Sequence, residues 1–252
     1  MRRVVKAALV LALAATLAGL AGGFGLAVHG ARYFFLERSR LRLEPVSPAA
    51  FAAANAALAP APGRRLVVFG DSRAAQFALP QAGAGRQVVN RGLAGESTVQ
   101  MAYRFEADVL SLSPDVVVIV AGINDLVAAA NLPEMERAAM AAAAANIARF
   151  ARAAAAAGSE VVISTVVRPA APRLIRRPFW SDRVYELVAE LNGQIRALAG
   201  PHIRVLEADA LLADDAARLP PAFATDEIHL STTANAVLDG ALARLLPPPR
   251  SP

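Results

Sequence analysis

The sequence predicts an α/β protein in which a five-stranded parallel sheet carries helices on both faces, preceded by one transmembrane helix. Two observations support this prediction. From about residue 64 onward, short β-branched runs alternate with helical segments, and such alternation is typical of parallel strands joined by right-handed crossovers. Nearer the N-terminus, the 22 residues 7–28 carry no charge, which is enough for a helix to cross a hydrocarbon core.

The N-terminal segment 1–30 is interpreted as a membrane anchor or a signal sequence. A cleaved signal peptide usually has an apolar region of only about 7–15 residues, so an uncleaved anchor through residues 7–28 is favoured. Positive charge before a span favours a cytoplasmic N-terminus. The rest of the chain is therefore expected in the periplasm or extracellular space, membrane-anchored, or secreted if the segment is cleaved. Three basic residues precede the apolar run: Arg2, Arg3 and Lys6.

Residues 31–63 are predicted to form a juxtamembrane helical stalk, and residues 64–252 the folded domain. Within the stalk, Ser47 followed by Pro48 is typical of a helix cap and a first-turn proline. This pair predicts a helix that ends near Leu58, ahead of the proline-rich segment at residues 60–63.

Five apolar runs are predicted to be strands, because strands covered on both faces are nearly continuous hydrophobic runs. They are residues 66–69, 88–90, 116–120, 161–167 and 203–206. Helices are predicted between the strands from capping and breaking residues, such as Ser97 before a helix and Gly158 after one. They are residues 73–77, 98–112, 133–158, 181–198 and 231–246. The alternation leaves the order of the strands open.

Composition excludes several classes of function. The chain has no cysteine, which removes disulfides, thiolate metal sites and cysteine nucleophiles. No histidine or carboxylate cluster has metal-ligand spacing, and no glycine-rich phosphate loop lies between a strand and a helix. The net charge is +5, but residues 1–45 hold seven of the 26 basic and two of the 21 acidic residues. The remaining 19 of each sign make the domain neutral, so nucleic acid is not an expected partner.

The residues that could carry chemistry follow the predicted strands. The carboxyl ends of parallel strands meet at one edge of a sheet, where ligands bind. A serine hydroxyl at that edge needs a base, and a histidine oriented by a carboxylate supplies one. Ser72 follows the first strand, while Asp226 and His229 lie on a loop beyond the fifth. Candidate donors to an oxyanion are the Ser72 N–H, the Gly95 N–H and the Asn124 side-chain amide.

Four segments in this order resemble the sequence blocks of the SGNH hydrolases, also called the GDSL lipase/esterase family. The resemblance covers residues 64–246 and implies a flavodoxin-like three-layer α/β/α sandwich that needs no cofactor. It implies Ser72 as nucleophile, His229 as base and Asp226 as the residue that orients the base. It also implies an oxyanion hole formed by Ser72, Gly95 and Asn124. The segments are Gly70-Asp71-Ser72, Gly95, Gly122-Ile123-Asn124-Asp125, and Asp226 with His229.

Structural roles compete with several of these assignments. Ser72 could merely cap a helix, Gly92 could replace Gly95 in the oxyanion hole, and Asp226 could be a cap that leaves a serine–histidine dyad. Two further aspartates, Asp71 and Asp125, are expected to be structural, and Glu227 is expected to be solvated.

Substrate contacts are less defined by the sequence. Arg73 departs from the usual family pattern, so Arg73, Arg168 and Trp180 are candidate substrate-binding residues. The segment 168–180 could be a substrate-facing lid, although an ordinary proline-rich connection is the favoured interpretation.

The expected function is a serine ester hydrolase that acts on acyl or acetyl esters outside the cytoplasm. Its substrate would be a small-molecule, lipid or glycan ester. One alternative is a polysaccharide O-acetyl esterase or O-acetyltransferase of the cell envelope, and another is a non-catalytic envelope-assembly protein with a hydrolase fold. The sequence favours no particular oligomeric state.

Overall fold

The structure is a computed structural model of the chain and describes residues 2–41, 49–61, 65–214 and 216–248. It divides into two compact units, Met1–Arg38 and Ser39–Pro252. The domain boundaries predicted at residues 30 and 63 stay predictions. The expected cap at Ser47 and Pro48 lies outside the described residues, and the helix expected after it is the short α2 (Ala52–Ala56).

The N-terminal unit is built from one long helix, α1 (Arg2–Leu41). Its segment Val5–Ser39 contains an 18-residue window with a mean hydropathy of 2.0, and none of that window is buried. A helix satisfies its own backbone hydrogen bonds, as a segment in lipid must. By length and composition α1 can therefore cross a membrane, which fits both a membrane anchor and a signal sequence.

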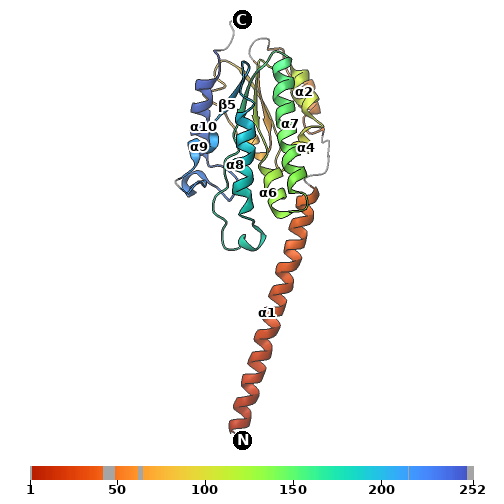
Figure 1. Cartoon of the computed structure of the whole chain (residues 1–252), viewed down its shortest axis with the longest axis vertical. Helices are drawn as coiled ribbons and strands as arrows, with labels where there is room; N and C mark the ends of the chain where they lie inside the picture. The colour runs from red at the N-terminus through yellow and green to blue at the C-terminus, as the bar shows by residue number, and fades with distance from the viewer. Residues whose placement is uncertain (1, 42–48, 62–64, 215, 249–252) are drawn as a thin grey trace. The chain divides into compact units, whose positions relative to one another are not determined.

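The larger unit contains the predicted parallel sheet, with strand order β2-β1-β3-β4-β5. All five residues of β3 are buried, because helices cover both faces (Figure 1). The order reverses between β1 and β3, which is the place where doubly wound sheets bind ligands. The strands are β1 (Arg65–Gly70), β2 (Gln87–Gly92), β3 (Val116–Val120), β4 (Glu160–Ser164) and β5 (Ile203–Leu206).

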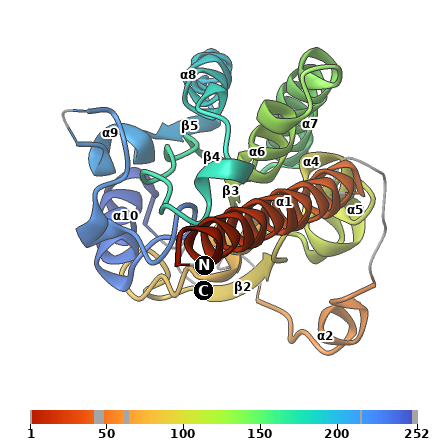
Figure 2. The same ribbon diagram turned by 90° about the horizontal axis from the view of Figure 1, so that it is seen from below.

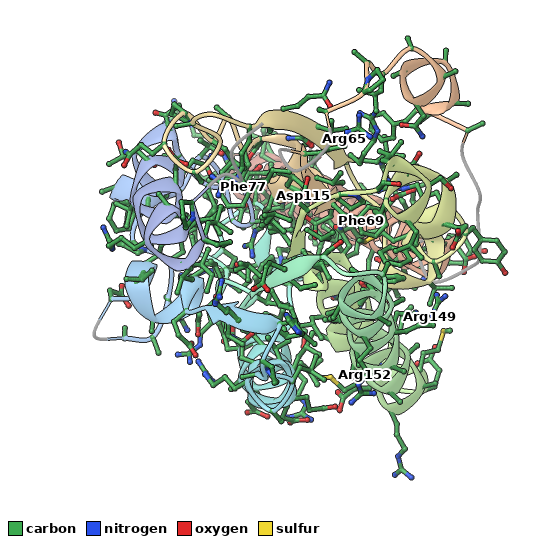
Figure 3. All side chains as sticks on the ribbon, turned by 90° about the horizontal axis from the view of Figure 1, so that it is seen from above. Arg65, Phe69, Phe77, Asp115, Arg149 and Arg152 are labelled. Carbon is green, nitrogen blue, oxygen red and sulfur yellow. The ribbon has the colours of Figure 1, made fainter. Side chains whose placement is uncertain are left out.

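Two helical layers complete a three-layer sandwich, which confirms the predicted fold class (Figure 2). Side chains alternate along each strand, so β1 contributes to both layers. Phe69 packs against Phe105 and Phe150, with ring centroids 5.3 and 5.5 Å apart, whereas Phe77 lies on the other side of the sheet, toward α10 (Figure 3). One layer contains α6 (Ile123–Asn131), α7 (Glu136–Ala156) and α8 (Arg183–Arg196), and the other α3 (Ser72–Ala75), α9 (Ala208–Leu212) and α10 (Thr232–Leu245).

The helix predicted over residues 98–112 is wrong as a single element. Ser97 does cap it, through a reciprocal capping box with Gln100. The chain then breaks before Arg104, whose buried guanidinium donates to the Gly70 carbonyl at 3.1 Å and to the Arg91 carbonyl at 2.9 Å. These contacts outside the helix outweigh continuous helical hydrogen bonding. The pieces are α4 (Thr98–Met101), α5 (Phe105–Asp108) and the 3₁₀ helix η1 (Leu110–Leu112).

Two helices were not predicted, α6 and α9, and β4 is shorter than expected. After Ser164 the chain leaves the ladder, because the Val166 N–H donates to the Asn192 side chain at 2.7 Å. The long alanine-rich helix begins at Glu136, since α6 already occupies the segment before Pro133.

Candidate active site

A strand-to-helix turn places Ser72 at the carboxyl edge of the sheet. Gly70 ends β1 against β3, where an added Cβ would lie 1.9 Å from the Val120 carbonyl oxygen, so a side chain does not fit. Asp71 caps α3 by accepting the Arg73 N–H at 2.8 Å. Ser72 is therefore the first residue of α3, held by tight packing below it and a cap beside it.

Ser72, His229 and Asp226 form one hydrogen-bonded chain, although 157 positions separate the serine from the histidine. The Ser72 Oγ lies 3.0 Å from His229 Nε2, and His229 Nδ1 lies 2.7 Å from Asp226 Oδ2. Asp226 Oδ1 accepts the backbone N–H groups of Ile228 and His229, both at 2.7 Å. The carboxylate thus fixes the loop as well as the imidazole ring.

Asp226 is poised to stay ionised. Partial burial acts to raise its pKa, but hydrogen bonds from the His229 ring and from the His229 and Ile228 N–H groups together lower the pKa to about 2. An anionic carboxylate beside Nδ1 favours the tautomer with a free Nε2 lone pair, and it stabilises an imidazolium when Nε2 takes a proton.

The expected oxyanion donors follow the ends of β1, β2 and β3, where Gly70 lies opposite Gly92 and Val120. Asn124 is buried in the first turn of α6 and donates one amide hydrogen to the Glu96 carbonyl at 2.9 Å, and its second amide hydrogen has no acceptor among the residues that the structure describes. Gly95 has φ +83°, a conformation that favours glycine. Within the described part of the chain, neither its N–H nor that of Ser72 has an acceptor. The Gly92 N–H is occupied by the Asn90 side chain at 2.8 Å, which favours Gly95 over Gly92.

Asp71 and Asp125 lie beside this site as buried structural groups. Asp125 accepts the Thr98 N–H at 3.0 Å and the Thr98 hydroxyl at 2.7 Å, which ties α6 to α4. Burial raises the pKa of Asp71 to about 6 and that of Asp125 to about 7, although hydrogen bonds from Arg73 and Thr98 oppose the shifts.

Replacing Asp125 by asparagine should flatten the pH dependence of stability. The folded-state pKa of Asp125 is raised, so its contribution is fully present below about pH 4 and is lost as the pH rises toward 7. At about 1.4 kcal/mol per pH unit, this loss is on the order of 4 kcal/mol. The melting temperature of wild type should fall relative to Asp125→Asn over this range when both are followed by Trp180 fluorescence. If the melting temperatures of the two proteins changed with pH in parallel, the result would contradict a raised pKa for Asp125.

Two of the three candidate substrate-binding residues are engaged inside the protein. Arg73 is 3% exposed, and its guanidinium donates to the carbonyls of Val167 and Ile228 at 2.7–2.9 Å. Its guanidinium supports the loop that carries His229, and a contact of Arg73 with substrate stays a prediction. Arg168 forms an ion pair with the buried Asp209 at 3.1 Å. A substrate contact for the half-buried Trp180 stays a prediction.

The roles of two buried charged residues, Glu227 and Arg104, differ from what their sequence context predicts. Glu227, expected to be solvated, is 3% exposed and binds Arg173 at 2.8 Å. Arg104 binds the Glu96 carboxylate at 2.7 Å while the Glu96 carbonyl accepts from Asn124. This pair fixes the loop that carries Gly95. A lone arginine within the otherwise amphipathic segment 98–112 was the signal for it.

No three His, Cys, Asp or Glu residues of the described segments are grouped so that they could hold a metal ion. The described site brings the Ser72 hydroxyl within 3.0 Å of His229 Nε2, and a serine nucleophile needs a base within this reach.

A family model matches most of this chain. Residues 60–237 match the model of the GDSL-like lipase/acylhydrolase family. No curated protein matches the sequence.

Solved structures share the fold. A protein from Bacteroides fragilis assigned as an acylhydrolase is 26% identical, with a TM-score of 0.64 over 78% of this chain and 93% of that one. A GDSL-like lipase from Bacteroides thetaiotaomicron is 25% identical, with a TM-score of 0.62 over 84% and 100%. An acetylxylan esterase from Geobacillus stearothermophilus, 20% identical with a TM-score of 0.57 over 72% and 93%, shares the fold. Since the family model spans more than half of the sequence, the chain belongs to the GDSL-like lipase/acylhydrolase family, whose members are the SGNH hydrolases.

Proposed function

We propose that this protein is a serine ester hydrolase in which Ser72 is the nucleophile, His229 the general base and Asp226 the residue that orients the base. The observation that carries the proposal is the continuous chain of hydrogen bonds from Ser72 Oγ through His229 to Asp226, with distances of 3.0 and 2.7 Å. A serine that merely capped a helix would not need a histidine Nε2 within reach of its hydroxyl.

The reaction follows from this arrangement. Ser72 Oγ attacks the ester carbonyl carbon while His229 Nε2 takes the hydroxyl proton. The carbonyl π electrons move onto oxygen, and the Ser72 N–H, the Gly95 N–H and the Asn124 amide stabilise the resulting oxyanion. The oxyanion collapses and expels the alcohol oxygen, which takes the proton from His229. Water then attacks the acyl-enzyme with His229 again as base, which releases the acid and restores Ser72.

The proposed substrates are acyl or acetyl esters outside the cytoplasm, with α1 as the anchor. The basic residues before the apolar run support this orientation. The His229 and Asp226 side chains are 33% and 34% exposed, and such an open edge admits a bulky alcohol group such as a glycan. An envelope O-acetyl esterase would resolve the acyl-enzyme with water and an O-acetyltransferase with a sugar hydroxyl. Product analysis with and without a sugar acceptor separates these two functions.

Labelling with a fluorophosphonate tests the proposal directly. The reagent should modify the folded protein once, at Ser72, because only a hydroxyl activated by a histidine attacks phosphorus rapidly. Peptide mapping by mass spectrometry locates the adduct, and a Ser181→Ala variant should label as wild type does. A folded protein that stays unlabelled, or that carries the adduct on another serine, would favour the non-catalytic alternative.

A further inference from the structure

The connection between β4 and α8 carries an exposed apolar pair at its tip, residues Leu174 and Ile175. Each side chain is 79% exposed, more than any other large hydrophobic side chain described in residues 49–248, where Tyr103 follows at 56%. Figure 1 shows this connection as a loop that projects beyond the first turn of α8. Single exposed apolar residues are common on protein surfaces, but two adjacent ones at a projecting tip are costly to leave in water.

Arginines surround this apolar pair. Arg173, Arg176 and Arg177 are all exposed, and residues 166–181 contain no acidic residue. Glu227 partly neutralises the first two, at 2.8 and 3.8 Å. Arg177 has no ion pair among the residues that the structure describes. Apolar side chains flanked by arginines are complementary to the interface of an anionic bilayer. The apolar side chains enter the boundary of the acyl chains, and the arginines bind lipid phosphate groups.

The tip is held rigidly beside the catalytic loop. The Ala170 N–H donates to the Glu227 carbonyl at 2.9 Å, and Arg173 Nε donates to the Glu227 carboxylate at 2.8 Å. Within the tip, the Arg176 N–H donates to the Arg173 carbonyl at 2.8 Å. Since Glu227 directly follows Asp226, the tip contacts the same loop that carries Asp226 and His229.

We propose that residues 173–177 form a membrane-docking tip, which places Leu174 and Ile175 in the interface of an anionic bilayer and turns the active-site edge toward it. The apolar helix α1 supports this assignment, because a chain tethered to a bilayer faces that surface at a high effective concentration. The tip would then select esters presented at the membrane surface, such as those of lipids or lipid-linked glycans. Docking itself does not depend on the proposed catalytic mechanism.

The absence of cysteine in the chain allows a clean test. The full-length protein carrying Ile175→Cys is labelled with the environment-sensitive fluorophore NBD. It is then reconstituted into vesicles of phosphatidylcholine alone or of an equal mixture with phosphatidylglycerol. Emission should shift to the blue and be quenched by brominated lipids in the anionic vesicles, and less so in the neutral ones. Raising the salt from about 0.1 M to about 1 M should weaken the neutral–anionic difference.

Two variants serve as matched controls. Ala157→Cys places the same label at an exposed position before β4, at the opposite edge of the sheet, and its emission should stay water-like in every vesicle. Arg177→Gln added to the labelled Ile175→Cys protein removes a charge without breaking an ion pair, and should reduce the quenching several-fold in anionic vesicles.

Three results would overturn the proposal. In the first, NBD at position 175 emits as NBD at position 157 does in anionic vesicles. In the second, its emission shifts equally in neutral and anionic vesicles, and in the third, the shift appears only when a soluble protein is added. Fluorophosphonate labelling of each variant reports the esterase site separately, so failure of docking and failure of the proposed function are distinguishable.

Discussion

Replacing Ser72 by alanine is expected to lower kcat for p-nitrophenyl acetate by roughly 10³- to 10⁶-fold while the fold is retained. The substitution removes only the side-chain hydroxyl group. Ser72 also begins α3 with its side chain pointing at His229 rather than into the core, because its Oγ lies 3.0 Å from His229 Nε2. Initial rates together with thermal melts of both proteins measure the effect.

A double variant sharpens this prediction. If the two residues act as one unit, Ser72→Ala combined with His229→Ala should lose no more activity than either single variant. Multiplicative losses would mean that serine and histidine act independently. Turnover retained in a folded Ser72→Ala protein would refute the nucleophile assignment altogether.

Replacing Gly70 by alanine should destabilise the domain by at least about 3 kcal/mol, the upper end of ordinary overpacking. The new Cβ would lie 1.9 Å from the Val120 carbonyl oxygen and 2.8 Å from the Ala74 Cβ. Both neighbours are fixed, one in β3 and the other in α3, so the strand end must move. A loss of this size lowers the melting temperature by roughly 6–12 °C for a domain of this length.

Gly193→Ala is the matched control for that substitution. Gly193 lies exposed in α8, with nothing within 4 Å of an added Cβ. Alanine there should stabilise the helix by up to about 1 kcal/mol. If both variants had the same melting temperature, the close approach of β1 to β3 would not explain why position 70 is a glycine. Any activity lost by Gly70→Ala should exceed the loss expected from unfolding, because Ser72 is only two residues away.

Local physics made the strands predictable from the sequence. Residues 116–120 are all β-branched, a composition that suits a strand buried on both faces, and the structure places them in the middle of the sheet. Capping chemistry is equally local, so Ser97 could be identified as the cap before the helix that follows it. The sequence also showed the order of the polar segments that follow the strands, and with it the family to which the chain belongs.

Side-chain environments could not be predicted in the same way, because each depends on partners far along the chain. Segment 98–112 has a helical pattern, yet Arg104 reaches Gly70 and Glu96 and the helix breaks there. Glu227 looks like a solvated residue in the sequence, but Arg173, 54 positions away, lies against it.

The sequence by itself therefore determined the fold class, the apolar helix and the candidate residues, since periodicity, length and capping act within a few residues. Only the tertiary structure decided which of those residues meet. It brought Ser72 within 3.0 Å of His229 across 157 positions, turned Arg73 inward and left Leu174 and Ile175 in solvent. The strand order and the crossovers bring these residues together. The residues lie so far apart in the sequence that a local pattern cannot predict their contacts.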